Sequence, residues 1–186
     1  MCRVVCCLLL CVALRPALAQ APRALAEVEA QLRHPEAAER MEAVRTLGRD
    51  FSHQAGALLI ATLGDEHPLV RVAAIKALRQ HAGLSRATDR LLALLDDDFP
   101  IVRQVAATAL GFSGEVRVVD PLLARAADRA ADTRRQAITS LGLLLPRHTG
   151  NTPVLDRIVT ALLALRHDAD PDVRRDSLAA LAQGKH

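Results

Sequence analysis

The chain has 186 residues and a formal net charge of +3, and its length is enough for one domain with a substantial core. Hydrophobic residues make up 51% of it, but most are alanine, leucine and valine, and aromatic residues make up only 2%. Because strands are enriched in aromatic and β-branched residues, this composition favours closely packed helices over sheets.

The N-terminal segment has the features of a secretory signal. Arg3 is followed by an apolar run over residues 4–14, by Pro16, and by the small-x-small sequence Ala17-Leu18-Ala19. This order predicts a signal peptide over residues 1–19, cleaved before Gln20. The apolar run is too short to span a bilayer as a helix. An ordinary buried N-terminal helix is the alternative, whereas a lipid anchor at Cys11 is disfavoured by the bulky leucine before it.

Removal of this segment changes the chemistry of the chain. All four cysteines lie within the first eleven residues, so the mature chain, residues 20–186, would have no disulfide, thiol nucleophile or soft metal site. Loss of Arg3 and Arg15 would leave 22 basic residues against 21 acidic ones. A nearly neutral chain does not indicate a nucleic acid or a strongly anionic membrane as its partner.

The remaining sequence predicts helices in pairs. The apolar spacing favours helices over residues 22–32 and 36–47, then from a cap at Ser52 to about residue 63, and over 68–80. Later helices are predicted over 84–95, 100–111, 115–127 and 131–145, and a final pair begins at Pro153. Residues 146–152 form the predicted loop before that pair. The leucine-rich runs 58–63 and 91–95 could be short strands, but their place in a two-helix period argues against it.

One motif recurs five times, most clearly in residues 97–111, where a turn ending in Pro100 precedes a helix. Its markers are the arginines Arg40, Arg71, Arg103, Arg134 and Arg174, which are 31, 32, 31 and 40 residues apart. A fixed period of this length is typical of stacked helix pairs. We therefore predict an all-α, right-handed α-solenoid of about five helix-pair repeats over residues 20–186.

Positions counted from each marker arginine predict one packing face of the second helix. Three residues on, the sequence has Ala43, Ala74, Ala106, Ala137 and Ser177; six residues on, it has Thr46, Ala77, Ala109, Ser140 and Ala180; seven residues on, it has Leu47, Leu78, Leu110, Leu141 and Leu181. Small residues let helices approach closely, and the leucines fill the space beside them.

An aspartate precedes four of the five marker arginines by six residues. We expect a structural ladder in which each aspartate accepts hydrogen bonds from an arginine or from helix N-terminal amides. A row of catalytic or ligand-binding charges is the alternative, but a catalytic group has no reason to recur in every repeat. The ladder residues are Asp65, Arg71, Asp97, Arg103, Asp128, Arg134, Asp168 and Arg174. His34 replaces the aspartate in the first repeat, as expected of an N-terminal cap.

The motif Asp65-x-x-Pro68-x-Val70-Arg71-x-x-Ala74-x-x-Ala77-Leu78, repeated at residues 97–110 and 168–181, resembles the HEAT-repeat family, in particular the short HEAT-like repeats of phycobilisome lyases. The fourth repeat departs from it, with Ala131 for the proline and Thr133 for the valine. The resemblance implies that the second helices line a concave surface and that this surface binds other proteins.

On those helices, the positions one and five residues after the marker lie opposite the packing face. We predict that they form the binding strip, with an acidic partner segment suited to the Arg135–Arg175 end. The alternative is that they are merely solvated. The strip residues are Met41, Arg45, Val72, Lys76, Gln104, Arg135 and Arg175, with Thr108, Thr139 and Ala179 completing the second row. The loop 146–153 is a second candidate site or a tolerated surface insertion.

The sequence has no histidine pair with metal-ligand spacing, no glycine-rich phosphate loop and no nucleophile elbow. We therefore expect no metal, no cofactor and no catalytic residue. The predicted function is an exported scaffold, periplasmic or secreted, that binds another protein and has no membrane span in its mature form. A lyase-like enzyme or accessory factor of the phycobilisome-lyase type is the alternative, and nucleic-acid binding is opposed by the absence of tryptophan and tyrosine.

Overall fold

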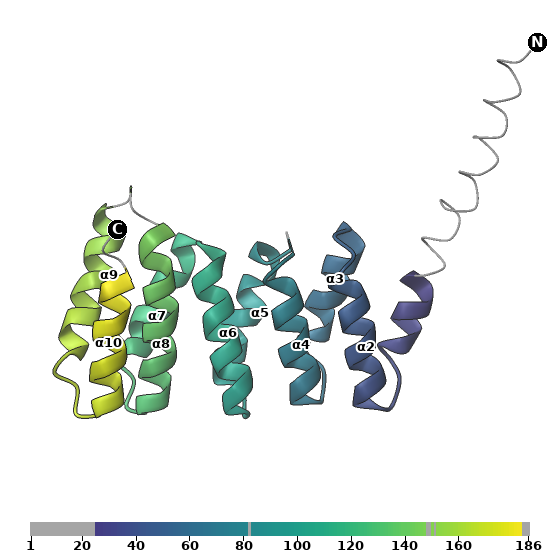
Figure 1. Ribbon diagram of the computed structural model, residues 1–186, viewed down its shortest axis with the longest axis horizontal. Helices are drawn as coiled ribbons and strands as arrows, with labels where there is room; N and C mark the ends of the chain where they lie inside the picture. Colours follow the sequence, from purple (N-terminus) through teal and green to yellow (C-terminus); the bar gives the residue numbers. More distant parts are fainter. Residues whose placement is uncertain (1–24, 82, 148–149, 151, 184–186) are drawn as a thin grey trace, which may run out of the picture.

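The computed structural model describes residues 25–81, 83–147, 150 and 152–183. The predicted signal peptide and all four cysteines lie outside these residues. Within the described part of the chain, every regular element is a helix. Figure 1 shows the helix pairs side by side in a single row from α2 to α10, which is the predicted α-solenoid.

The described helices fall into five pairs. The first pair is a helix over residues 25–31 followed by α2 (Ala37–Leu47). The other pairs are α3 (His53–Thr62) with α4 (Pro68–Leu78), α5 (Thr88–Ala93) with α6 (Pro100–Ser113), α7 (Val119–Ala126) with α8 (Ala131–Leu144), and α9 (Thr152–Leu165) with α10 (Pro171–Gln183). Short 3-10 turns η1 (Ser85–Ala87) and η2 (Leu94–Asp96) flank α5, and η3 (Val116–Val118) and η4 (Leu145–Arg147) precede α7 and follow α8.

The helix boundaries follow from particular residues. The Ser52 side chain accepts a hydrogen bond from the Ala55 amide and caps α3, as predicted. Pro68 and Pro100 occupy the first turns of α4 and α6, where a missing amide proton costs nothing. Gly114 ends α6 with φ of 68°, a left-handed conformation that glycine adopts without strain.

Residues 58–62 belong to α3, and residues 91–95 belong to α5 and η2, which excludes the strand alternative. The predicted loop 146–152 is shorter than expected, because Pro146 belongs to the turn η4 and α9 already begins at Thr152. The long fourth interval between marker arginines therefore reflects this turn and the 14 residues of α9, compared with 10 in α3.

The second helices form the inner layer of the solenoid. Each packs directly on the next, in the order α2, α4, α6, α8 and α10. Among the first helices of the described pairs, only α7 and α9 pack together appreciably, and they do so less extensively than any two neighbouring second helices. The second helices are therefore the more closely packed layer of the solenoid.

The predicted packing face is buried. All five residues three positions after the marker arginines are fully inaccessible to solvent, and so are most of the leucines seven positions after them. Among the residues at the three positions, Thr46 is exposed, and Ala77 and Leu181 are only partly buried. Thr46 and Leu181 belong to the terminal repeats, each of which has a neighbour on one side only.

Glycine lets two pairs of inner helices come especially close. A Cβ atom on Gly111 of α6 would lie 2.7 Å from Leu143 Cβ of α8, and one on Gly142 of α8 would lie 2.8 Å from Ala180 Cβ of α10. Neither distance is tolerated between carbon atoms, so the C-terminal halves of these helices need glycine for their present spacing.

Candidate functional site

The marker arginines tie each turn to the helix that follows it. In all five repeats, Nη1 donates hydrogen bonds of 2.7–3.1 Å to the two carbonyl oxygens five and six residues earlier. A planar guanidinium satisfies two carbonyls at the end of a turn and still has donors left over. The sequence pattern did not reveal this contact.

The remaining donors connect neighbouring repeats at three junctions. Arg40 makes a bidentate pair with Asp65, and Arg134 makes one with Asp168, at 2.7–2.9 Å. At the α4–α6 junction, Arg71 reaches Asp97 through Nη2 alone, at 2.8 Å. The hydrogen bond from Arg134 is the main cause that lowers the pKa of Asp168 below its ordinary value.

The ladder is interrupted at the α6–α8 junction. Arg103 bonds to the carbonyls of its own turn, but no hydrogen bond or ion pair joins it to Asp128. Asp128 is exposed, and it accepts a hydrogen bond from the amide of Ala130 instead. The third and fourth repeats are therefore held together by other contacts.

The predicted binding strip is largely accessible. Arg45, Lys76, Gln104 and Arg175 are exposed, and Met41 and Arg135 are partly exposed. Val72 differs from the others because its exposed fraction is only 6%. It therefore offers almost no surface to a partner.

Carboxylates neutralise the basic end of that strip. Arg135 of α8 donates to Asp176 of α10 at 2.8 Å, and Arg175 donates to Asp172 at 2.7 Å and to Asp176 at 3.1 Å. Burial alone would raise the pKa of Asp176, but hydrogen bonds from both arginines outweigh it and lower that pKa. The positive charges at this end are therefore already paired within the chain, which disfavours an acidic partner segment there.

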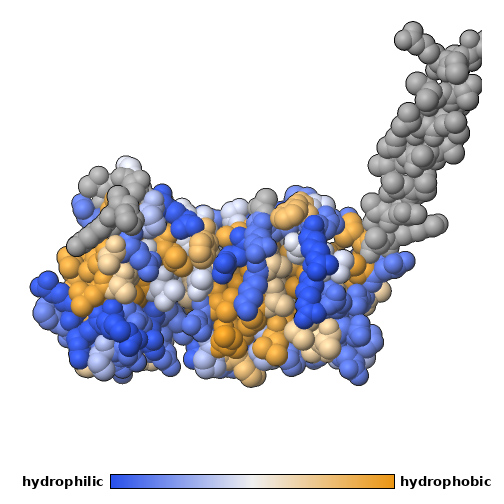
Figure 2. Space-filling model, viewed as in Figure 1, coloured by the Kyte–Doolittle hydropathy of each residue, from blue (hydrophilic) through white to orange (hydrophobic). Residues whose placement is uncertain are grey.

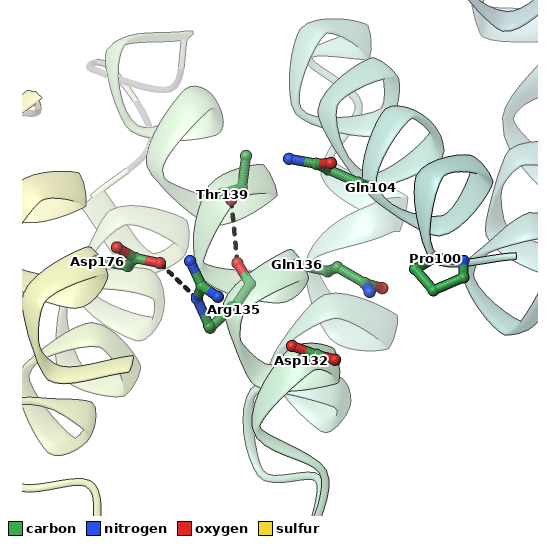
Figure 3. A pocket seen from close by; sticks show the side chains of 7 residues that line it. All are labelled: Pro100, Gln104, Asp132, Arg135, Gln136, Thr139 and Asp176. Carbon is green, nitrogen blue, oxygen red and sulfur yellow. Dashed lines mark hydrogen bonds and ion pairs between the residues drawn. The ribbon is translucent and has the colours of Figure 1, made fainter. Parts of the chain in front are cut away.

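A groove lies between the N-terminal halves of α6 and α8 on the inner layer. Its volume is about 190 Å³, and Pro100 and Gln104 line one wall while Asp132, Gln136 and Thr139 line the other. Figure 3 shows the Gln104 and Gln136 side chains projecting into the groove from opposite sides, while Arg135 and Asp176, which also line it, face each other. We call this space the inner groove. A second groove, of about 350 Å³, continues from it toward α10.

An exposed apolar row beside this groove was missed in the sequence. Leu69, Phe99 and Ile101 are 50%, 46% and 45% exposed, although large apolar side chains are usually buried. Figure 2 shows apolar side chains gathered over the lower halves of α4 and α6. Leu69 and Ile101 both precede a marker arginine by two residues. That position lies one turn before the predicted strip on the same helix face, so the spacing could have identified it.

A larger apolar groove, of about 610 Å³, lies on the outer side of the last pair. Leucines and valines of α9 and α10 line it, among them Leu155, Leu163 and Leu178. Its lining resembles the surface on which one helix pair stacks against the next, and it contains few polar groups to orient a ligand. The inner groove, by contrast, combines apolar, amide and acidic side chains.

No group of three or more histidine, cysteine or acidic side chains that could hold a metal ion occurs in residues the structure describes. In the candidate loop, Arg147 donates to the Leu143 carbonyl, while His148, Thr149 and Asn151 lie outside the described residues. None of the described helices is both long and apolar enough to cross a bilayer.

The repeat also matches a known family. A sequence model of HEAT repeats matches residues 25–111 and 56–142, which together are more than half of the chain. The chain belongs to the HEAT-repeat family. No curated protein matches it.

Solved structures with similar folds include other helical-repeat proteins. The complex of CpcE and CpcF of phycocyanin lyase from Nostoc sp. PCC7120 matches with a TM-score of 0.65 and 22% identity, over 86% of this chain and 98% of that one. A designed armadillo repeat protein in complex with the peptide (KR)4 matches with a TM-score of 0.59 and 20% identity, over 91% and 84%. Computationally designed armadillo repeat proteins for modular peptide recognition match with a TM-score of 0.55 and 22% identity, over 86% and 81%. At these identities the likeness concerns the fold alone.

Proposed function

We propose that this HEAT-repeat chain is a non-catalytic scaffold that binds a segment of another protein across its inner layer. The observation that carries the proposal is the exposed row Leu69, Phe99 and Ile101 beside the inner groove. Apolar side chains that gather on a surface next to polar groups typically mark a protein interface, because their contact with water is unfavourable until a partner covers them.

Two similar structures support a binding role by analogy. CpcE is seen in complex with CpcF, and a designed armadillo protein is seen in complex with a peptide. Both are stacked helical repeats, and such arrays offer one long surface on which a partner can make the same kind of contact at each repeat. What these proteins bind does not identify the partner of this chain.

The charged residues of the repeats support a structural rather than a catalytic role. Arg40, Arg71 and Arg134 are engaged by carbonyls of their own turns and by aspartates of the next turn. A general acid, base or nucleophile needs access to a substrate. These three arginines have little access to a substrate, since each side chain is largely covered by its neighbours.

We also propose that the scaffold is exported, to a periplasm or out of the cell. The support is the order of charge, apolar run and cleavage sequence in residues 1–19. Mass spectrometry of the protein from the exported fraction should find a mature N-terminus at Gln20. Recovery of the intact chain from the cytosol alone would contradict export without affecting the binding proposal.

The binding proposal is tested with two variants of matched exposure. Partners are captured from the exported fraction on the wild-type chain, and their affinity is then measured for Leu69→Ser/Ile101→Ser and for Val116→Ser. Val116 is 49% exposed but belongs to η3, outside the inner layer. The double variant should bind at least about tenfold more weakly, and Val116→Ser should bind like wild type. Equal affinities for all three proteins would exclude the inner layer as the site.

A lyase-like role is the competing proposal, and the CpcE–CpcF structure is the observation that favours it. Incubation of the purified chain with a bilin, followed by gel filtration, distinguishes the two functions. Visible absorbance that elutes with the protein would favour the lyase-like role, and its absence would favour the scaffold.

A further inference from the structure

The chemistry of a partner segment can be deduced from one row of residues. Leu69, Ile101 and Asp132 each lie two residues before a marker arginine, so they occupy equivalent positions on α4, α6 and α8. All three side chains are exposed. A segment that crosses the inner layer along this row therefore meets two apolar side chains and then a carboxylate.

The spacing of the helices sets the spacing of the contacts. Packed helices lie about 8–10 Å apart, and an extended chain advances about 3.3 Å per residue. Consecutive positions of the row are therefore about three residues apart along an extended partner. A segment of about seven residues would reach from Leu69 past Ile101 to Asp132.

The charge of the inner groove selects the residue at the end of that segment. The neighbouring carboxylates Asp172 and Asp176 are paired with arginines, as described above. Arg135, which also lines the groove, interacts electrostatically with Asp132 but donates its hydrogen bond to Asp176. The Asp132 carboxylate accepts no hydrogen bond from any residue that the structure describes, and the two carboxylates that line the groove, Asp132 and Asp176, outnumber its one guanidinium group. An incoming cation would thus be favoured, and an incoming carboxylate would be repelled.

The amides in the groove suit the same occupant. Neither the Gln104 nor the Gln136 side chain has a hydrogen-bond partner among the described residues, and both project into the groove, with Gln136 on the side of Asp132 and Gln104 on the side of Thr139 (Figure 3). A lysine ammonium carries three donors and no acceptor, so the Asp132 carboxylate and an amide oxygen of the groove can accept from it together. The NH₂ groups of the two glutamines can also turn toward backbone carbonyls of an extended segment.

We propose that the partner segment is extended, with apolar residues at its first and fourth positions and a lysine or arginine at its seventh. The apolar residues cover Leu69 and Ile101, and the cation enters the inner groove beside Asp132. This inference rests on the proposed function and specifies the partner of the same site.

The test uses fluorescent seven-residue peptides and fluorescence anisotropy with the full chain. The probe is Leu-Ser-Ser-Leu-Ser-Ser-Lys with blocked ends, together with its reversed sequence, because the row does not fix the direction of the partner. One comparison peptide ends in glutamate instead of lysine, and another has serine in place of both leucines. The lysine probe, in one of its two directions, should bind at least about fivefold more tightly than either comparison peptide.

Protein variants then identify the contact. Asp132→Asn should weaken the lysine probe about threefold to fivefold, and Asp132→Lys should weaken it about tenfold and make the glutamate peptide the better ligand. Glu27→Lys makes the same charge change at an exposed position in the first repeat, far from α8, and should leave the binding of every peptide unchanged.

The outcomes separate this inference from the proposed function. Preference of the wild-type chain for the glutamate peptide, or equal weakening by Asp132→Lys and Glu27→Lys, would overturn the basic segment but leave the inner layer as the site. Failure of all the peptides to bind would also overturn it. The scaffold proposal would then still be decided by partner capture with the Leu69→Ser/Ile101→Ser variant.

Discussion

Two neighbouring junctions of the inner layer are built from the same repeat but are held together at different places. Between α4 and α6, Arg71 bonds to Asp97 at 2.8 Å near the N-terminal ends of the helices, and both side chains are almost fully buried. Between α6 and α8, the corresponding Arg103 and Asp128 do not meet. There the Ser140 hydroxyl donates to the Ala107 carbonyl at 2.7 Å, closer to the C-terminal ends.

The difference follows from the departures in the fourth repeat. Val70, Val102 and Val173 are fully buried one residue before their marker arginines, but Thr133 is only partly buried at the same position. Without a buried valine, this turn lacks an apolar anchor on its neighbour, and Asp128 remains exposed. A degenerate repeat thus leaves the N-terminal halves of two helices apart, and the inner groove lies between them.

The largest expected difference between the two junctions is in the effect of removing their aspartates, Asp97 and Asp128, one at a time. Asp97 and Asp128 each accept a hydrogen bond from the amide two residues later, but only Asp97 also binds an arginine of the preceding repeat. Asp97→Ala should lower the free energy of unfolding by roughly 3 kcal/mol, because Arg71 would lose its counter-ion in a largely buried site. Asp128→Ala should cost about 1 kcal/mol or less. Urea denaturation followed by circular dichroism measures both, and equal losses would show that the α4–α6 ion pair contributes little.

The next largest effect should come from the glycine at the close approach of α6 and α8. A Cβ atom on Gly111 would lie 2.9 Å from the Ser140 carbonyl oxygen as well as against Leu143. Gly111→Ala should therefore destabilise the chain by about 1–2 kcal/mol, even though alanine is the better helix former by about 1 kcal/mol.

Gly64→Ala is the matched control for this prediction. Its added methyl group would meet only the Ala61 carbonyl oxygen, at 3.7 Å, which is an ordinary contact. Thermal unfolding should give a melting temperature equal to or above that of wild type for Gly64→Ala and a lower one for Gly111→Ala. A Gly111→Ala protein at least as stable as wild type would mean that α6 and α8 can separate without cost.

The sequence predicted the helix pairs and the buried face because both depend on spacing alone. Alanine at positions such as Ala74 and Ala106 recurs at fixed distances from the marker arginines, and a helix places those distances on one face whatever the partner. The same spacing from the marker arginines would have identified Leu69 and Ile101, which lie one turn before the predicted binding strip.

The properties that depend on how two helices meet could not be predicted in this way. Val72 is buried although its position in the repeat is exposed on the other second helices or only partly buried there, and the pairing of Arg135 with Asp176 joins residues 41 positions apart. The gap between Arg103 and Asp128 results from the fit of a whole turn against its neighbour. A repeat pattern gives the residues available at each junction but not the distance between them.

A smaller effect is expected from the hydrogen bond that holds the α6–α8 junction. Ser140→Ala removes the buried bond to the Ala107 carbonyl and should cost about 1 kcal/mol. Thr139→Ala removes only an exposed bond to the Arg135 carbonyl within the same helix, so it should change the melting temperature little. If the two variants unfold at the same temperature, the Ser140 hydrogen bond does not stabilise the α6–α8 junction.

The smallest expected effect is on the stability of the fold at acidic pH. The folded-state pKa of Asp168 is lowered, mainly by its hydrogen bond from Arg134, so this carboxylate contributes stability that is fully present above its unfolded-state pKa and is lost as the pH falls through the folded-state value. Wild-type stability should therefore decline below about pH 4.

Asp168→Asn should be less stable than wild type at pH 7, and the difference should shrink toward pH 3. Asp128→Asn, at the junction without an ion pair, is the matched control. Melting temperatures between pH 3 and pH 7 measure all three proteins, and parallel curves for wild type and Asp168→Asn would mean that the α8–α10 pair adds nothing to the acid sensitivity of the fold.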